Sequence, residues 1–224
     1  MKLKKILKII IIICGSVGSG LTLFSGGYNL DTLLYFTILS NIAVVFITSM
    51  FLYMDDSNKE IKMVWHILRY MIAAAITLTF IVFNATLMPE MIKNGDGLDL
   101  LKMSNLLNHN ITPVLFVVDF VLFGKLIPLN KIYYTLFMPL GYFIITLMMN
   151  PIFGVTYGSN NEIVPYFFLN YQKNGWFSLS GGFFGIGVFY WVIIVLVIVL
   201  LIGYGLFLLR NLNKNEFYIV DATT

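Results

Sequence analysis

Two polar clusters in the chain contain side chains that can do acyl-transfer chemistry. The first lies in the sequence YFTILSN, where Thr37, Ser40 and Asn41 stand at positions i, i+3 and i+4 and so share one face of a helix. The second cluster contains His109. A threonine hydroxyl is a weak nucleophile until an adjacent base takes its proton, and imidazole can accept that proton near neutral pH. Thr37 and His109 are therefore our candidate nucleophile and base.

Acyl transfer also needs hydrogen-bond donors for the negative charge that develops on the carbonyl oxygen. Side-chain amides of asparagine are suitable donors, and the same polar faces carry several of them. The sequence offers no reason to prefer one of them as an oxyanion donor or as part of the cavity lining. The candidates are Asn41, Asn84, Asn105 and Asn108.

The histidine cluster, NLLNHNITP, is unusually polar for an apolar segment. Asn105, Asn108, His109, Thr112 and Pro113 fall on one face of a helix. Proline has no N–H to donate to the carbonyl four residues before it, which is that of His109, so the helix should loosen or kink there. A loosened backbone beside a histidine is a plausible place for a site.

Both clusters also have a purely structural interpretation. Serine, threonine and asparagine side chains often join membrane helices through interhelical hydrogen bonds, and a single membrane histidine can do the same. Thr77 and Asn84 on a third segment, and Asn150 with Pro151 on a fifth, either line the same cavity or pack against neighbouring helices.

Asp119 is the most costly residue in the chain, since a carboxylate at the centre of a bilayer costs roughly 3 kcal/mol on insertion scales. It must face the interior, be protonated or be paired. It lies about 15 Å along the helix from His109, so we expect a structural hydrogen bond and not a role in orienting the imidazole. His66 and Arg69 lie near the cytoplasmic end of another segment, where we expect them to reach the interface.

The elements that must position these residues are transmembrane helices. The chain has 224 residues, of which 59% are hydrophobic and only 11% charged, so it has too few charges to cover a water-soluble globule of this size. We predict an all-α integral membrane protein, one domain over residues 1–224. A membrane span needs about 20 apolar residues. Six candidates are found at about 6–25, 33–54, 64–88, 105–127, 132–152 and 187–209.

The longest connection, 153–186, mixes polar residues with aromatic ones such as Tyr166 and Trp176. Aromatic side chains of this kind lie comfortably at the depth of lipid headgroups. We therefore predict an ordered interfacial loop on the extracytoplasmic side. The sequence shows no internal repeat or low-complexity tract.

The distribution of lysine and arginine predicts the orientation of the six spans. Three basic residues, Lys93, Lys102 and Lys173, fall on one side of the membrane. The opposite side carries Lys2, Lys4, Lys5, Lys8, Lys59, Lys62, Arg69, Lys125, Lys131, Arg210 and Lys214. Because loops rich in lysine and arginine are retained in the cytoplasm, we expect both termini to be cytoplasmic.

This orientation brings the two clusters to a common depth. The second and fourth spans both run inward from the outer surface, and Thr37 and His109 each lie about four residues past the start of their span, or roughly 6 Å at the helical rise. The carbonyl of a lipid ester lies naturally near this boundary while its chains remain in hydrocarbon. A hydroxyl and an imidazole can then meet, although which helices are neighbours does not follow from the sequence.

The N-terminus, MKLKKILKIIIIICGSVGSG, also resembles a secretory signal. Five further apolar segments favour a signal anchor, and Ile13 before Cys14 is a poor fit to a lipoprotein cleavage site. We expect the small residues Ser16 and Gly20 to allow close helix packing.

Other classes of chemistry find no support. Two histidines at opposite ends of the bundle, a single cysteine (Cys14) and no acidic cluster argue against a metal centre. We find no phosphate loop or dinucleotide fingerprint, so no cofactor is expected. The formal charge of +3 comes from dispersed lysines, which argues against a nucleic-acid partner.

Five motifs resemble those of the androgen-induced family of six-span membrane threonine hydrolases, most closely its bacterial branch. Each is weak alone, but their order and spacing from about residue 30 to 210 make the resemblance fairly specific. The motifs are YFTILSN at 35–41, HNITP at 109–113, VDFVLF at 118–123, PLGY at 139–142 and PYFFLN at 165–170.

The resemblance implies a hydrolase of fatty acyl esters in which Thr37 is the nucleophile and His109 the second catalytic residue. Animal members are associated with hydrolysis of fatty-acid esters of hydroxy fatty acids, and for this chain the reaction class carries over better than that substrate. The expected partners are membrane lipids and a lipid ester, and the expected location is a bacterial plasma membrane. The oligomeric state does not follow from the sequence.

Two other functions stay open at this point. A non-enzymatic carrier or scaffold would use the same polar residues to line a path or hold helices together, and Asp119 and the Pro113 kink favour it because mid-membrane carboxylates and broken helices recur in transporters. An acyltransferase would use the same dyad with an alcohol in place of water as the acceptor.

Overall fold

Six helices long and apolar enough to cross a membrane make up most of the chain, as its hydropathy predicts. The structure is a computed structural model that describes residues 2–25, 30–57, 60–93, 95, 97–158, 160–180 and 185–221. The spanning stretches are Lys2–Ser25, Phe36–Asp56, Met63–Lys93, Met103–Phe123, Leu129–Phe153 and Val188–Asn213.

Three of the spans are single α-helices and three are composite. The single helices are α1 (Lys2–Ser25), α3 (Phe36–Asp56) and α10 (Val188–Asp221). The composite spans are α4 (Met63–Val82) with η1 (Phe83–Leu87) and α5 (Met88–Lys93), α6 (Met103–Leu106) with η3 (Leu107–Ile111) and α7 (Thr112–Phe123), and η4 (Leu129–Leu136) with α8 (Phe137–Phe153). The connections contain α2 (Leu30–Leu33), η2 (Gly97–Leu101), η5 (Phe167–Leu169) and α9 (Tyr171–Asn174).

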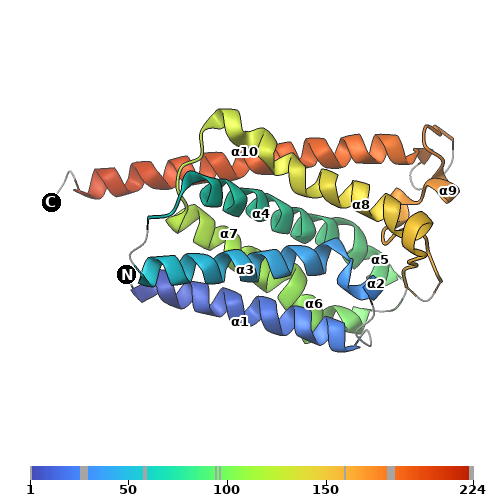
Figure 1. The fold of residues 1–224 in the computed structure, drawn as a ribbon, viewed down its shortest axis with the longest axis horizontal. Coiled ribbons are helices and arrows are strands. Elements are labelled where there is room, and N and C mark those ends of the chain that lie inside the picture. The colour runs from blue at the N-terminus through green and yellow to red at the C-terminus, as the bar shows by residue number, and fades with distance from the viewer. Residues whose placement is uncertain are drawn as a thin grey trace.

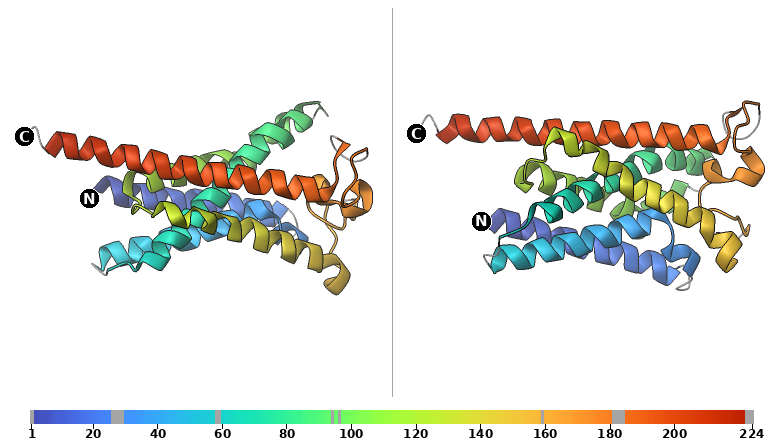
Figure 2. Two further views of the ribbon diagram at one scale, coloured as in Figure 1. Left: turned by 90° about the horizontal axis from the view of Figure 1, so that it is seen from above. Right: turned by 45° about the horizontal axis from the view of Figure 1, so that its top comes forward.

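The helices form a bundle in which α4 is central. Helix α1 packs along α3, while α4 contacts α3, α7, α8 and α10. The two termini lie at the same end of the bundle, and the segment that contains α9 lies at the other end (Figure 1). Two further views show that α8 runs along the outside of the bundle (Figure 2).

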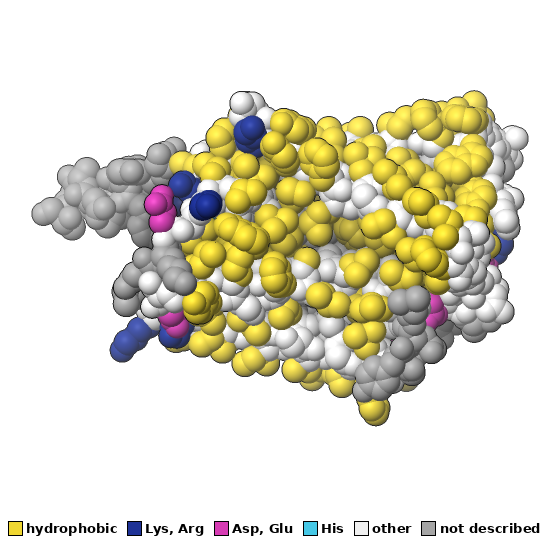
Figure 3. All heavy atoms as spheres, viewed as in Figure 1, with side chains coloured by type: hydrophobic (Ala, Val, Ile, Leu, Met, Phe, Trp, Pro, Cys, Tyr) yellow, Lys and Arg dark blue, Asp and Glu magenta, His cyan; other side chains and the backbone are white. Residues whose placement is uncertain are grey.

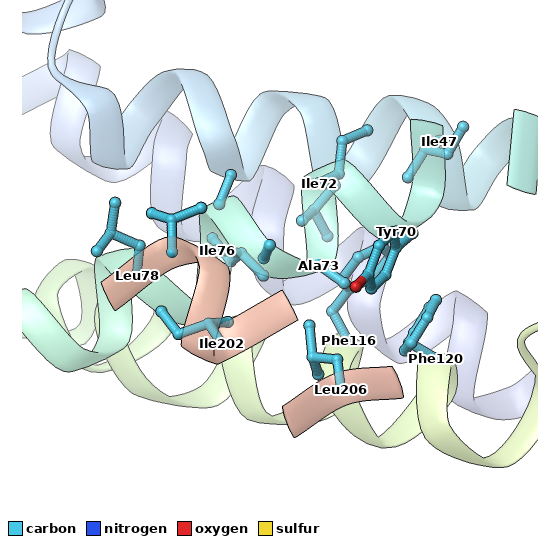
Figure 4. Close-up of a cluster of buried hydrophobic side chains, with 14 of the residues drawn as sticks. Ile47, Tyr70, Ile72, Ala73, Ile76, Leu78, Phe116, Phe120, Ile202 and Leu206 are labelled. Atoms are coloured by element: carbon cyan, nitrogen blue, oxygen red, sulfur yellow. The ribbon is translucent and has the colours of Figure 1, made fainter. Parts of the chain in front are cut away.

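The core explains why α4 can be central. Its run Ala73, Ala74 and Ala75 is fully buried, and small side chains let neighbouring backbones approach closely. Around this run, Tyr70 on α4 stacks on Phe120 of α7 with ring centroids 5.7 Å apart (Figure 4). The Tyr70 hydroxyl donates to the backbone carbonyl of Gly203 on α10 at 2.7 Å, so three helices are joined at one point.

The surface fits lipid as the surrounding solvent. Apolar side chains cover most of the visible face, and the charged side chains on it gather toward the ends of the bundle (Figure 3). The six-span prediction rests on the same physical fact, that an apolar surface of this extent is stable only in contact with hydrocarbon.

Small residues of α1 pack against two other helices, but they are not the ones the sequence suggested. Ser16 and Gly20 are exposed, and a Cβ added at Gly20 would meet nothing within 4 Å. The close approaches occur at Gly15, which faces Val45, and at Gly18, which faces η3. The prediction for Ser16 and Gly20 is therefore wrong, because the buried face of α1 is rotated by part of a turn relative to the one we chose.

Gly18→Ala is expected to destabilise the protein by about 1–3 kcal/mol, as overpacking of a close-packed contact does. A Cβ at Gly18 would lie 2.7 Å from Asn108 Oδ1 and 2.8 Å from Leu107 Cβ. Gly20→Ala on the same helix is the matched control and should be neutral or slightly stabilising, since alanine is the better helix former. Denaturant unfolding in detergent measures both, and equal stability of the two variants would contradict the packing.

A buried charge cluster joins α1, α4 and α7. Asp119 of α7 is 1% exposed, and its two carboxylate oxygens bind different cations. Lys8 Nζ on α1 lies 3.1 Å from one oxygen, and the Arg69 guanidinium on α4 binds the other. Asp119 is thus paired, which is one of the three states expected for a carboxylate in this position.

Arg69 corrects the interfacial interpretation of the sequence. Its side chain is 2% exposed and also donates to the backbone carbonyl of Asp119 at 3.0 Å. On α10, Arg210 donates to the carbonyl of Gly124, and Asn213 donates to that of Val121. The last carbonyls of a helix have no partner within the helix, so these side chains satisfy the end of α7. Arg69 is therefore held in the interior by a carboxylate and by carbonyls.

The connection between α8 and α10 is ordered over its described residues and packs on the bundle. Val164 and Leu169 are buried, and the backbone of Tyr157 pairs with that of Glu162 in both directions. Asn170 accepts a hydrogen bond from the Lys173 backbone and so begins α9. This segment places Tyr166 against the start of α3.

Candidate functional site

Two π-helical turns face each other in the interior near the end of the bundle away from the termini. The ring of Phe83 in η1 stacks on the imidazole of His109 in η3, with centroids 3.9 Å apart and planes 14° apart. Beside this stack, the Asn84 amide donates to Asn110 Oδ1 at 3.1 Å. Turns of this kind occur mostly within α-helices and are frequent at functional sites. The stack on Phe83 fixes the plane of the His109 imidazole.

The π-helical turn at His109 is the irregularity that Pro113 predicts. Proline lacks an N–H for the carbonyl four residues back, so a regular α-helix cannot continue through this point. The turn Leu107–Ile111 ends immediately before α7, where Pro113 is in the first turn and buried. Asn108 and Thr112 are also buried, which confirms that this polar face points into the bundle.

Thr37 lies in the first turn of α3, after an extended residue, Tyr35. The first N–H groups of a helix have no partner in the helix. Here the hydroxyl of Tyr166 lies close to the backbone of Phe36 and Thr37 and to the Thr37 side chain. Burial raises the pKa of Tyr166 to about 12, so its hydroxyl stays protonated at neutral pH. Tyr166 thus holds the nucleophile candidate in place.

Two cavities meet at these residues. The first is narrow, with a volume of about 80 Å³, and lies between α3, α4, α8 and α10. The second has a volume of about 410 Å³ and lies between α1, α3, α5, α6 and the segment around Tyr166. Both cavities are lined by Thr37, Phe83, Leu87, His109 and Tyr166. The structure therefore places the candidate nucleophile and the candidate base on the same internal surfaces.

The imidazole of His109 has a ring nitrogen that can still form a hydrogen bond. Its Nδ1 atom is buried and has no hydrogen-bond partner among the described residues. A buried polar atom without a partner is costly, and a catalytic role is one of the explanations for it; His66 Nδ1 is in the same state. His109 is thus available to accept a proton from a group in the cavities.

The four asparagines differ in what their amide groups already bind. Asn41 donates to the carbonyls of Thr37 and Asn108, at 2.8 and 3.0 Å, and Asn84 donates to Phe80 and Asn110. Both N–H groups of these two amides are engaged. Asn105 donates to the Asp99 carbonyl.

Asn108 binds the end of α1 and not the dyad. Its amide donates to the Thr22 hydroxyl at 2.9 Å, and its Oδ1 faces the Ser19 hydroxyl at 3.5 Å. Asn105 and Asn108 line the larger cavity, whereas Asn41 and Asn84 line neither of the two.

The remaining polar residues belong to helix packing. Ser40 and Thr48 are buried on the same face of α3 as Thr37, as predicted, and the Ser40 hydroxyl meets that of Thr79 on α4 at 3.1 Å. Thr77 donates to a carbonyl of its own helix, and Asn150 donates to Val155.

No three His, Cys, Asp or Glu side chains among the described residues come together as a metal ion would require. Asp119 lines neither cavity, and both of its carboxylate oxygens are occupied by cations. The chemistry that this site can support therefore comes from its hydroxyl, imidazole and N–H groups.

Sequence reasoning missed Tyr166 and Phe83 as parts of the site. Tyr166 occurs in PYFFLN, one of the motifs that resemble the family, but nothing in the sequence predicted its contact with Thr37. Phe83 is one of 20 phenylalanines, and no pattern distinguishes it from the others. Its role depends on a contact between two spans that are separate in the sequence.

Comparison of the chain with models of protein families, with curated proteins and with solved structures finds no match.

Proposed function

We propose that this chain is an intramembrane hydrolase of fatty acyl esters, with Thr37 as the nucleophile and His109 as the general base. The observation that carries the proposal is that both side chains line the same two internal cavities, between helices distant in the sequence. The resemblance of the motifs to six-span membrane threonine hydrolases supports it independently. An acyltransferase would share this dyad and differ only in the acceptor.

The proposed reaction has two halves. The Thr37 oxygen attacks the ester carbonyl carbon while its proton passes to the imidazole of His109. The tetrahedral intermediate then breaks its bond to the alcohol oxygen, which takes the proton from His109 and leaves. Water attacks the resulting acyl-threonine with the same base, which releases the fatty acid and restores the Thr37 hydroxyl.

The Tyr166 hydroxyl is the donor that best fits the developing oxyanion, because it lies beside Thr37 at the start of α3. Donors held in place before the reaction stabilise negative charge without reorganisation. Asn41 and Asn84, whose amides already donate twice, are weaker candidates, and Asn105 and Asn108 face the larger cavity from farther along it.

The proposed location is the plasma membrane of a bacterium, with both termini in the cytoplasm and the site near the extracytoplasmic leaflet. The bias of lysine and arginine supports this orientation. Both termini lie at one end of the bundle (Figure 1), and the site lies toward the other end, so cytoplasmic termini would put the site near the extracytoplasmic leaflet. Lys59 and the side chain of Lys214, which contribute to the bias, lie outside the described residues.

A carrier or scaffold is the alternative, and the geometry favours it less. Its strongest support was Asp119, which is held by Lys8 and Arg69 and lines neither cavity. A carrier would depend on this carboxylate more than on Thr37, so Asp119→Asn would impair it more than Thr37→Ala.

Labelling with a fluorophosphonate tests the proposed function directly. Purified wild-type protein in detergent is expected to hydrolyse a p-nitrophenyl fatty acyl ester and to form a covalent bond between the probe phosphorus and the Thr37 oxygen, with loss of fluoride. Mass spectrometry of the digested protein locates the label. A label on Ser40, the nearest hydroxyl on the same face, or neither label nor hydrolysis, would refute the assignment.

A further inference from the structure

We infer that the two cavities separate the two halves of the ester, and that the alcohol half is an uncharged group that carries hydroxyls, as in a monoacylglycerol. This inference rests on the proposed function, because it assigns the parts of the substrate around the Thr37–His109 pair. It goes further by naming which ester the site prefers.

The narrow cavity suits the acyl chain. From the dyad it extends along Leu78 and Val82 of α4, Phe143 of α8, and Val192 and Val195 of α10, all of which are apolar. Val192 and Val195 lie four and seven residues into α10, so this cavity points from the end of the bundle toward its middle. A single hydrocarbon chain that starts at the dyad would lie along these apolar side chains, between α4, α8 and α10.

The larger cavity suits a polar group. From the same dyad it extends toward the bundle end, where its lining includes the hydroxyls of Thr22, Thr32 and Tyr35 and the amides of Asn105 and Asn108. These five side chains come from α1, α2, α6, η3 and the residue before α3. Hydroxyl and amide groups are both donors and acceptors, so they match the hydroxyls of a polyol.

Charge argues against an anionic alcohol. Sites for phosphate or carboxylate normally present arginine or lysine, yet no described residue that lines the larger cavity is charged. A negative charge lies close to this lining: burial raises the pKa of Tyr35, and the Asp31 carboxylate raises it further. A lysophospholipid or an ester of a hydroxy fatty acid would bring its anion to this place without a cation to pair with.

Four esters of one acyl chain test the inference: monooleoylglycerol, oleoyl lysophosphatidic acid, the oleic ester of hydroxystearic acid, and methyl oleate. The purified protein in detergent is expected to hydrolyse monooleoylglycerol with a kcat/KM at least about tenfold above each of the other three, because an unpaired anion or an unfilled polar cavity is costly. Release of oleate is measured in each case, and methyl oleate reports the dyad without engaging the larger cavity.

Two variants locate the preference. Thr22→Val and Thr32→Val each remove one hydroxyl from the larger cavity and are expected to lower the ratio of kcat/KM for monooleoylglycerol over methyl oleate by about threefold to tenfold. Thr77→Val is the matched control, because this hydroxyl, like that of Thr22, donates to the carbonyl four residues back in its own helix but lines neither cavity. Thr22→Val also removes the hydrogen bond between Thr22 and Asn108, so Thr32→Val serves as an independent second test.

The outcomes distinguish failure of the substrate assignment from failure of the hydrolase assignment. Turnover of methyl oleate with a preference for either anionic ester, or a ratio unchanged in both Thr22→Val and Thr32→Val, would overturn the inference and leave the hydrolase intact. Failure to hydrolyse any of the four esters would overturn both.

Discussion

Replacing Thr37 with valine or His109 with phenylalanine is expected to lower kcat for ester hydrolysis by about 10²–10⁴-fold. Valine keeps the shape of threonine and removes only the hydroxyl, so the nucleophile is lost at little structural cost. Phenylalanine keeps a ring to stack on Phe83 but cannot accept a proton. Initial rates with a p-nitrophenyl ester measure both effects.

The two losses are also expected to be non-additive. Because the hydroxyl and the imidazole act in one step, the double variant should be about as slow as the worse single variant. Thr37→Ser keeps a nucleophile and should retain measurable turnover. If the two losses multiplied instead, the two residues would not act as a dyad.

His66 provides the matched control for His109. It is the other histidine of the chain, and its ring centroid lies 5.2 Å from that of Phe51. It lies on α4, near the end of the bundle that holds the two termini. His66→Phe should therefore hydrolyse the ester at close to the wild-type rate. Equal losses in the His66 and His109 variants would point to a general effect of removing a half-buried imidazole and not to base catalysis.

Asp119→Ala is expected to lower the free energy of unfolding by about 3–5 kcal/mol. The substitution leaves Arg69 buried without a counter-charge and Lys8 with only a distant one, at 2% and 0% exposure. Asp55 on α3 is 3.8 Å from Lys8 and already pairs with Lys4 at 2.8 Å, so it replaces little of the lost interaction. Denaturant unfolding in detergent measures the change.

Asp56→Ala is the matched control for this prediction. Asp56 also pairs with a lysine of α1, Lys5 at 2.6 Å, but both side chains of that pair are about half exposed. Exposed pairs contribute little, so this variant should lose less than about 1 kcal/mol. Similar losses of stability in the two variants would show that the buried ion pairs of Asp119 contribute no more than an exposed pair.

A further combination separates charge from packing. Replacing Lys8, Arg69 and Asp119 together with apolar residues of similar volume should recover much of the stability that Asp119→Ala loses, because no buried charge remains unpaired. Hydrolysis by the folded triple variant should persist, since Asp119 lines neither cavity. If the triple variant folded but did not hydrolyse the ester, Asp119 would be needed for function, as the carrier alternative predicts.

The sequence by itself determined the solvent, the number of spans and the inward faces. Runs of about 20 apolar residues can bury their backbone polar groups in hydrocarbon only as helices, so the six spans follow from composition and length alone. The helical period then places Ser40, Asn41 and Thr48 on one face, and all three are buried. Pro113 likewise determined where the fourth span departs from a regular α-helix.

Only the tertiary structure decided which of these faces meet. Hydropathy is nearly equal around an apolar helix, so it could not show that α1 packs through Gly15 and Gly18, or that Lys8 reaches Asp119. The contacts of Tyr166 with Thr37 and of Phe83 with His109 join segments far apart in the chain. In lipid, helix association depends on close packing and a few hydrogen bonds and not on a hydrophobic driving force, and those contacts exist only once the helices are adjacent.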